Sequence, residues 1–271
     1  MIAYTDTHCH LDFDAFQEDR EAVLNRALEA GLARMLNPGV DVSSSRAAVQ
    51  LAESHPEVYA AVGVHPSSAL TWDEGTLDQL ADLVSDHGHS THPKVKAIGE
   101  IGLDYYRDRA PRELQRHVFQ EQLKLAERME LPVIVHNRQA TADTLEILAE
   151  WQELLRARRS PLAYRAGVLH SFSDDEQAAR RALQLNLFIG ISGPVTFKNA
   201  ARLQDVVANL PLECLLSETD APFLTPHPHR GKRNEPVFVC QVVEKIAAIK
   251  NQPLPFVAEK TSVNAKRLFE W

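Results

Sequence analysis

Two histidines separated by one residue, His8 and His10, stand near the start of the chain. In an extended strand, side chains at positions i and i+2 point to the same face, so both imidazoles could reach one cation. Cys9 would point the other way and is expected to pack as a small residue. A single His-x-His pair is weak support for a metal site, so the prediction depends on which other residues lie beside it in the folded protein.

Further ligand-type side chains stand where later apolar runs end. They are Glu100, His136, His170 and Asp220. Each has an ordinary structural explanation: a surface ion pair for the glutamate, a core position for the histidines, and a helix N-cap for the aspartate. Without a metal site, all of these separate explanations would have to hold together, each at the end of an apolar run. The six residues together therefore predict a metal site built from imidazole and carboxylate ligands.

The elements that must position these residues alternate regularly along the chain. Short apolar runs predict strands at 2–7, 33–37, 58–64, 95–101, 132–135, 166–169, 187–191 and 213–218. Amphipathic runs predict helices at 19–30, 112–130, 141–155, 174–185, 199–209, 237–250 and 255–269.

The strand ends recur about every 30 residues, which is the size of a βαβ repeat. Eight such repeats with no linker between them predict one domain over 1–271, a single (β/α)8 TIM-like barrel with the metal site at the C-terminal ends of its strands. A doubly wound open sheet is the alternative. That fold usually carries a Gly-rich phosphate-binding turn after the first strand, where this chain has His8, Cys9 and His10.

Composition limits the functional classes. The chain has 271 residues, 44% of them hydrophobic, and a formal charge of −8, which argues against coating nucleic acid through bulk electrostatics but not against an enzyme that acts on it. Cys9, Cys214 and Cys240 are widely spaced, so a disulfide framework is not expected. Without an apolar run of about 18 residues or a basic leader, we expect a cytoplasmic protein with no membrane contact and no evident obligate protein partner. His87 and His89 are expected to face solvent.

Six sequence blocks carry a family resemblance. They are DTHCHLDF (6–13), GVHP (63–66), IGEIGLDYY (98–106), PVIVHNRQA (132–140), HSFS (170–173) and ETDAPFLTPHPHRGKRNEP (218–236). In this order they make the chain similar to the TatD family of metal-dependent deoxyribonucleases, among the amidohydrolase-type barrels. The resemblance runs from residue 5 to about 269. One departure is Ser171, where the family commonly has cysteine, and a residue beside the ligand should not affect metal binding.

The ligand chemistry and the resemblance together imply two divalent ions, Mg²⁺, Mn²⁺ or Zn²⁺, because six ligands exceed what one four-coordinate ion needs. His8, His10 and Asp220 would hold one ion, His136 and His170 the other, and Glu100 would bridge them. A water activated between the ions would attack a phosphodiester bond, and Asp220 could accept its proton. Two further carboxylates are open to interpretation: Glu218 could hold a histidine or pair with a lysine, and Asp104 could orient a ligand or the loop.

The resemblance implies a hydrolase of ester bonds with DNA as its substrate. His65, Arg230, Arg233 and Asn234 are the predicted substrate-binding residues, on the argument that arginine suits phosphate and asparagine a sugar or base. For His65, orientation of the ligands or a structural role is the alternative. Tyr105 and Tyr106 could stack on a base or only pack their loop. The alternative function is a related hydrolase acting on another bond, such as the ester of a D-aminoacyl-tRNA, since a phosphate-binding loop would look alike for DNA and tRNA.

Overall fold

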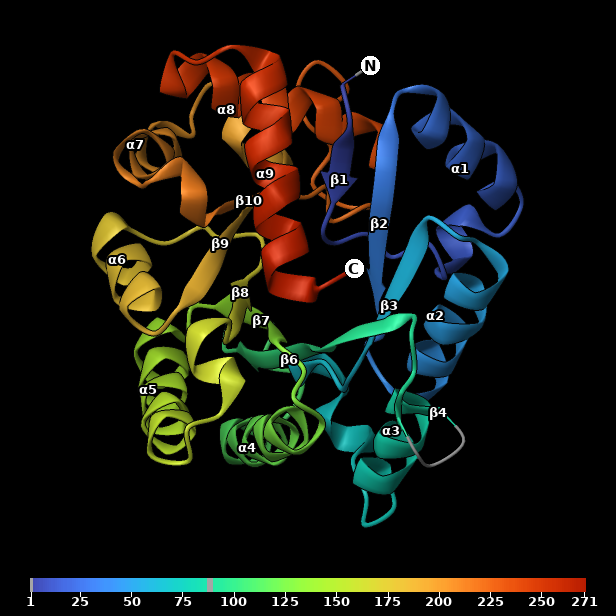
Figure 1. The fold of residues 1–271 in the computed structure, drawn as a ribbon, viewed down its shortest axis with the longest axis vertical. Helices are drawn as coiled ribbons and strands as arrows, with labels where there is room; N and C mark the ends of the chain where they lie inside the picture. The colour runs from blue at the N-terminus through green and yellow to red at the C-terminus, as the bar shows by residue number, and fades with distance from the viewer. Residues whose placement is uncertain (1, 87–89) are drawn as a thin grey trace.

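A ring of eight parallel strands forms the centre of the protein. The computed structural model describes residues 2–86 and 90–271 (Figure 1). The strands are β1 (Tyr4–Asp6), β2 (Leu32–Pro38), β3 (Val58–Val62), β6 (Val95–Asp104), β7 (Val133–Arg138), β8 (Gly167–Leu169), β9 (Leu187–Ile191) and β10 (Leu215–Ser217). They pair in this order, and every pairing is parallel.

The first and last strands close the ring. The backbone N–H of Thr7 donates to the carbonyl of Ser217 at 3.1 Å, and Cys9 and Ala221 form a parallel bridge just beyond the strand ends. The predicted (β/α)8 barrel is therefore confirmed, and the open doubly wound sheet is excluded.

Helices cover the outside of the ring and match the predicted ranges closely. They are α1 (Arg20–Glu29), α2 (Val42–Ser54), α3 (Thr76–Val84), α4 (Arg112–Met129), α5 (Thr141–Ala157), α6 (Glu176–Gln184), α7 (Ala201–Asn209), α8 (Val239–Lys250) and α9 (Leu254–Phe269). The sequence pattern predicts no helix range for α2 or α3. The inward face of α2 is built mainly from small residues, such as Ser45 and Ala48, which give a weak apolar pattern.

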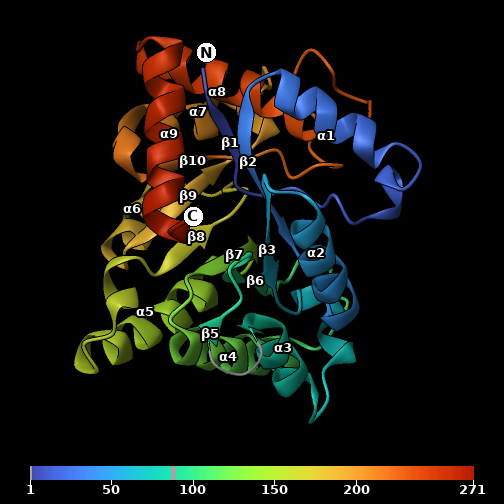
Figure 2. The ribbon, with the colours of Figure 1, turned by 45° about the vertical axis from the view of Figure 1, so that its right-hand side comes forward.

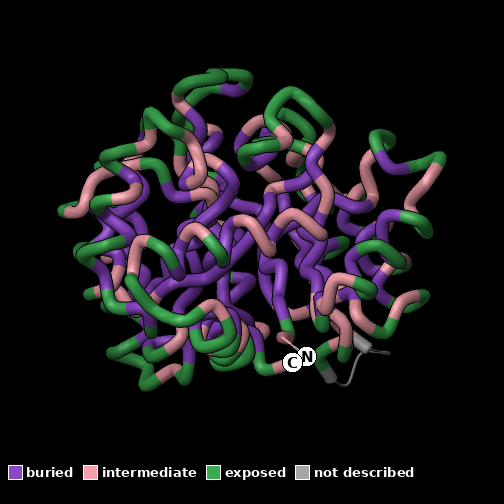
Figure 3. Tube along the Cα trace, turned by 90° about the horizontal axis from the view of Figure 1, so that it is seen from above, coloured by how far each residue is buried: buried purple, intermediate pink, exposed green. Residues whose placement is uncertain are grey.

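The N-terminal end of the barrel is filled with apolar side chains. Leu36, Ile134, Phe188 and other inward residues pack against the end of α9, where Leu268 is buried. In Figures 1 and 2, α9 crosses this end, and Figure 3 shows buried positions concentrated in the interior beneath exposed helices and loops. Because this end is closed by packing, polar groups can collect only at the other end, where the strands finish.

The longest strand, β6, carries both Glu100 and Asp104 and continues past its predicted end at 101. Its pairing with β7 shifts between Ile98 and Ile101 and then sets Gly102 opposite His136. Gly102 has φ +133°, and a Cβ there would overlap the backbone oxygen of His136. Glycine therefore lets the two strands approach closely at the level of two predicted ligands.

Other parts of the chain bear less on the site. A small antiparallel pair, β4 (Ser85–Asp86) and β5 (Ser90–Thr91), interrupts the barrel pattern before β6.

His87 and His89 lie outside the described residues. Cys9, Cys214 and Cys240 are free. Across residues 2–86 and 90–271, no helix is long and apolar enough to cross a membrane.

Replacement of Gly102 by alanine tests the close approach of β6 and β7. The left-handed backbone alone costs about 1–2 kcal/mol for alanine, and overpacking adds about 1–3 kcal/mol. We expect Gly102→Ala to lower the free energy of unfolding by both contributions in urea titrations. Gly231→Ala is the matched control, because Gly231 also has positive φ but open space around its Cβ position. Equal losses in the two variants would contradict the packing argument.

Candidate metal centre

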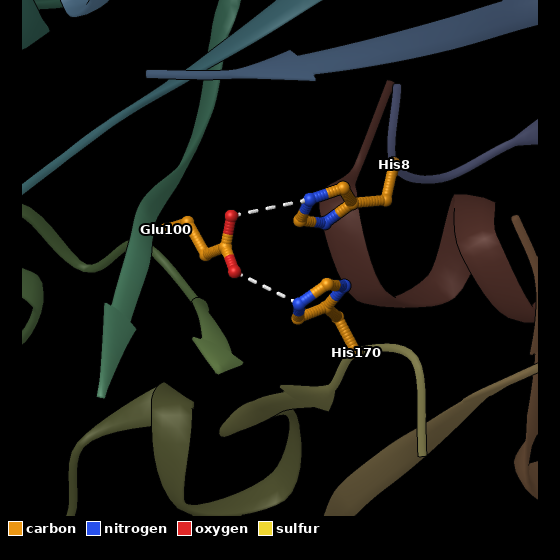
Figure 4. A group of neighbouring side chains, drawn as sticks. All are labelled: His8, Glu100 and His170. Carbon is orange, nitrogen blue, oxygen red and sulfur yellow. Dashed lines mark ion pairs between the residues drawn. The ribbon is translucent and has the colours of Figure 1, made fainter. Parts of the chain in front are cut away.

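The six predicted ligands converge at the C-terminal end of the barrel. His8 and His10 follow β1, Glu100 lies in β6, and the others come from β7 and from the ends of β8 and β10. Glu100, His8 and His170 point toward one another in Figure 4 and are almost fully buried. Residues from opposite ends of the sequence thus meet in one site because the barrel brings their strand ends together.

The carboxylate of Glu100 lies at the middle of the cluster and faces two pairs of histidines. Its Oε2 atom is 3.4 Å from Nε2 of His8 and 3.6 Å from Nε2 of His10. Its Oε1 atom is 2.8 Å from both Nδ1 of His136 and Nε2 of His170. One carboxylate therefore offers a different oxygen to each pair, which is the geometry a bridging ligand needs.

On the Oε2 side, hydrogen bonding fixes which ring nitrogen of His10 is free. Nδ1 of His10 lies 3.2 Å from the carbonyl of Pro38, which can only accept, so Nδ1 carries the proton and Nε2 keeps its lone pair. That lone pair faces Nε2 of His8 at 3.2 Å and Oδ1 of Asp220 at 3.7 Å. Acceptor atoms are thus gathered around a common point.

On the Oε1 side, both ring nitrogens of His136 face carboxylates. Its Nε2 lies 3.2 Å from Oδ2 of Asp104, and its Nδ1 lies 2.8 Å from Oε1 of Glu100. Burial acts to lower the pKa of His136, but these two contacts raise it above its usual value; burial is likewise outweighed at His170, where Glu100 foremost raises the pKa to about 10. Nδ1 of His136 also lies 3.3 Å from Nε2 of His170. Protons on these rings therefore occupy the positions that a bound cation would take beside the other oxygen of Glu100.

Converging lone pairs are unfavourable unless a cation or a proton lies between them, so the donor set fits metal binding. Burial lowers the pKa of His8 well below its usual range and that of His10 to about 4, which keeps both rings in the neutral form a metal requires. Burial would raise the pKa of Glu100, but the adjacent histidines, His170 foremost, hold it well below its usual range. Burial also raises the pKa of Asp220 to about 6.

His65 joins the cluster as a hydrogen-bond donor. Its Nδ1 accepts from the backbone N–H of Ser67 at 2.9 Å, so the proton of the neutral ring is on Nε2. Nε2 points at Oε1 of Glu100 from 3.5 Å. Although His65, Glu100 and His136 also lie close enough to group as ligands, this tautomer makes the His65 ring a donor toward the site.

Glu218 lies beside His170 and contacts the backbone of the next residue. It is fully buried, accepts a very short hydrogen bond from the N–H of Ser171, and lies 3.7 Å from Nδ1 of His170. Burial raises its pKa to about 7. Of the two interpretations of Glu218, the contact with a histidine agrees with this geometry, whereas the ion pair with a lysine does not. Asp104 contacts both the predicted ligand His136 and the backbone of its own loop, so both interpretations of Asp104 agree with the geometry.

Two predicted substrate contacts have structural partners instead. The guanidinium of Arg233 forms two hydrogen bonds with Asp19, at 2.8 and 2.7 Å, and a third with Glu235 at 3.0 Å. Asn234 is fully buried, and its amide donates to the carbonyls of Thr219 and Phe223. Arg233 and Asn234 therefore hold the loop after β10 in place, and their role in substrate binding stays a prediction.

Arg230 remains exposed, with its guanidinium 4.1 Å from the ring centroid of Phe197. The two tyrosines after β6 differ from each other. The Tyr105 hydroxyl donates to Asp143 at 2.6 Å, which fixes its ring to α5, whereas Tyr106 is 57% exposed.

Phe13 is a neighbour of the cluster that the sequence does not predict; its ring stacks on the His10 imidazole with centroids 4.5 Å apart. Its place three residues after His10 is a signal that could have drawn attention to it.

Comparison with known proteins identifies relatives along the whole chain. The family model described as TatD related DNase matches residues 5–270. A Bacillus subtilis protein described as the uncharacterized metal-dependent hydrolase YabD is 41% identical over 264 residues, covering 97% of this chain and 98% of its own. The 3'-5' ssDNA/RNA exonuclease TatD of Erwinia tasmaniensis is 34% identical, covering 97% and 98%.

A solved structure gives the same result. The crystal structure of YjjV, a TatD homologue from Escherichia coli, superimposes with a TM-score of 0.89 at 35% sequence identity, covering 99% of this chain and 98% of that one.

Removal of the Asp104 carboxylate tests how the second histidine pair is oriented. Without it, Nε2 of His136 loses its acceptor and the ring can rotate or change tautomer, so we expect Asp104→Ala to weaken metal binding by about 10- to 100-fold. Calorimetric titration of the metal-free protein with Zn²⁺ and Mn²⁺ measures this. Asp143→Ala is the control, because Asp143 holds Tyr105 and Arg116 but no ligand. Unchanged affinity in Asp104→Ala would refute the orienting role.

Proposed function

This chain belongs to the TatD family of metal-dependent hydrolases, and we propose that its substrate is DNA, whose phosphodiester bonds it cleaves with the help of two divalent ions. The observation that carries the proposal is the Glu100 carboxylate, whose two oxygens each face a separate pair of histidine nitrogens. Two-ion centres of this kind suit the displacement of an oxygen at phosphorus. The exonuclease name carried by the relative from Erwinia tasmaniensis agrees with this substrate class.

Each ligand has an assigned place. His8, His10 and Asp220 would hold one ion, His136 and His170 the other, and Glu100 would bridge the two. Ions held there supply Lewis acidity, which lowers the pKa of water and offsets negative charge on the phosphoryl oxygens. The carbonyl of Pro38 holds His10 in the ligating tautomer, and the carboxylate of Asp104 orients the ring of His136, so these two side chains are positioned before an ion binds.

The remaining residues act on the substrate and the proton. Asp220 would accept the proton of the attacking water, because its carboxylate lies at the edge of the cluster beside His8 and His10. The Nε2–H of His65, which lies on the Oε1 side of Glu100, would donate to a phosphoryl oxygen. Arg230, exposed on the loop after β10, is available for a substrate phosphate. The bond broken joins phosphorus to a sugar oxygen of the nucleotide.

A direct test is cleavage of end-labelled single-stranded DNA by one purified preparation, with and without EDTA. We expect cleavage that stops on removal of metal and returns when Mn²⁺ or Mg²⁺ is added. The same preparation should leave the ester of D-aminoacyl-tRNA intact. Cleavage that persists after complete metal removal would refute the mechanism, and metal-dependent hydrolysis of the tRNA ester alone would favour the alternative substrate.

The bridging role of Glu100 is tested by Glu100→Gln. The amide keeps the shape but offers only one acceptor oxygen and no charge, so we expect the number of ions bound per chain to fall from two to at most one. Activity should fall by roughly 100-fold or more, as on loss of other electrostatic contacts to a transition state. Metal content is measured by elemental analysis after dialysis. Glu244→Gln, at an exposed position on α8, is the control. Two ions in Glu100→Gln would rule out a bridge.

A further inference from the structure

An exposed aromatic platform lies just after β6. Tyr106 is 57% exposed, and the guanidinium of Arg138, the last residue of β7, lies 4.2 Å from its ring centroid. The backbone N–H of Tyr106 donates to Oδ1 of Asp104 at 3.0 Å, while Oδ2 of the same carboxylate faces His136. The position of this ring is thus coupled to the position of a predicted ligand.

A second aromatic group lies after β1 and β10. Phe13 stacks on His10, and the ring of Phe223 lies 6.2 Å from that of Phe13 and 6.4 Å from that of His10, edge-on to both. Phe223 is 49% exposed. Phe223 is therefore a large apolar ring that stays about half exposed beside a predicted metal ligand, and its exposed surface could stack on a planar group such as a base.

The barrel order places the two groups on opposite sides of the metal centre. β1 and β10 are neighbours where the ring closes, whereas β6 and β7 are the fourth and fifth of its eight strands. In a closed ring of eight, these pairs lie across from each other. The ligands between them come from both sides, so a chain bound at the centre would pass from one aromatic group to the other.

We propose that Tyr106 and Phe223 each stack on an unpaired base, one on either side of the phosphodiester bond that is cleaved. This inference rests on the proposed function and specifies the form of its substrate. Aromatic stacking accepts any base, because every base has a π face, and Arg138 adds cation–π and phosphate attraction beside Tyr106. Bases inside a duplex are stacked on both faces, so the arrangement selects single strands or frayed ends.

Tyr105 shows what a structural tyrosine looks like in the same loop. Its hydroxyl is bonded to Asp143, and the guanidinium of Arg112 lies 4.3 Å from its ring centroid. Packing of the loop is therefore already provided by Tyr105. Tyr106 contributes its backbone to the turn through Asp104, and its exposed ring is left for a ligand.

Binding to a non-hydrolysable ligand separates stacking from catalysis. The probe is a short single-stranded oligodeoxynucleotide with phosphorothioate linkages, compared with a copy in which an end nucleotide is an abasic sugar. We expect wild-type protein to bind the complete strand about tenfold more tightly, the value of one base stacked on an aromatic ring. Tyr106→Ala should bind the complete strand and the copy that is abasic at one end equally well. Phe223→Ala should show the same loss of preference for the copy that is abasic at the other end. Tyr106→Phe and Phe223→Tyr should keep it.

Tyr164→Ala is the matched control, because Tyr164 is 87% exposed but precedes β8 at the opposite end of the barrel. Melting temperatures of all variants show whether they remain folded. If folded Tyr106→Ala and Phe223→Ala proteins retain the full preference while wild type cleaves DNA, the stacking inference is wrong and the proposed function stands. If wild type binds neither oligonucleotide and cleaves no DNA, the proposed function is wrong and the inference falls with it.

Discussion

The carboxylate of Glu100 is the contact on which the site depends. Burial of a charged carboxylate is costly unless it is paired, and Glu100 is surrounded by imidazoles that come from both sides of the barrel. Its position requires β6 and β7 to approach closely, which Gly102 permits, and requires the ring to close between Cys9 and Ala221 so that His8 and His10 reach it. Features far apart in the sequence thus serve one buried group.

The convergence of the six predicted ligand residues could be predicted from the sequence, because one rule of barrel geometry is enough for it. Once the alternation of strands and helices is recognised, any residue at a strand end is known to lie near every other strand end. His136, His170 and Asp220 could be grouped with His8 on that basis alone, without knowing any distance. The tautomers could not be predicted, since they depend on acceptors such as the carbonyl of Pro38, whose place is set by the register of the sheet.

The roles of loop residues were harder to predict, because their contacts follow no general rule of the barrel and depend on residues distant in sequence. Arg233 is of the right type for a phosphate contact, but its partner Asp19 precedes α1, at the other end of the sequence, and nothing local to residue 233 indicates this pairing. Asn234 is similar, because its burial follows from the path of the whole loop. A polar side chain at a rim serves the substrate only if no carboxylate or carbonyl within the protein already occupies it, and that is a property of tertiary structure.

The net charge of −8 takes a different meaning in this setting. Charges separated by more than about 8–10 Å are screened at physiological salt, so the total matters less to a bound phosphate than the few groups near it. Near the site, cations bound at the proposed centre would offset Glu100 and Asp220, and the charge of Arg233 is already neutralised by Asp19 and Glu235. Arg230 and Arg138 are exposed beside aromatic rings and can attract a phosphate backbone. A DNA substrate, as proposed, would be held by the metal centre, by these arginines and by uncharged contacts, and exposed rings such as Tyr106 and Phe223 can supply the uncharged contacts without a large basic surface.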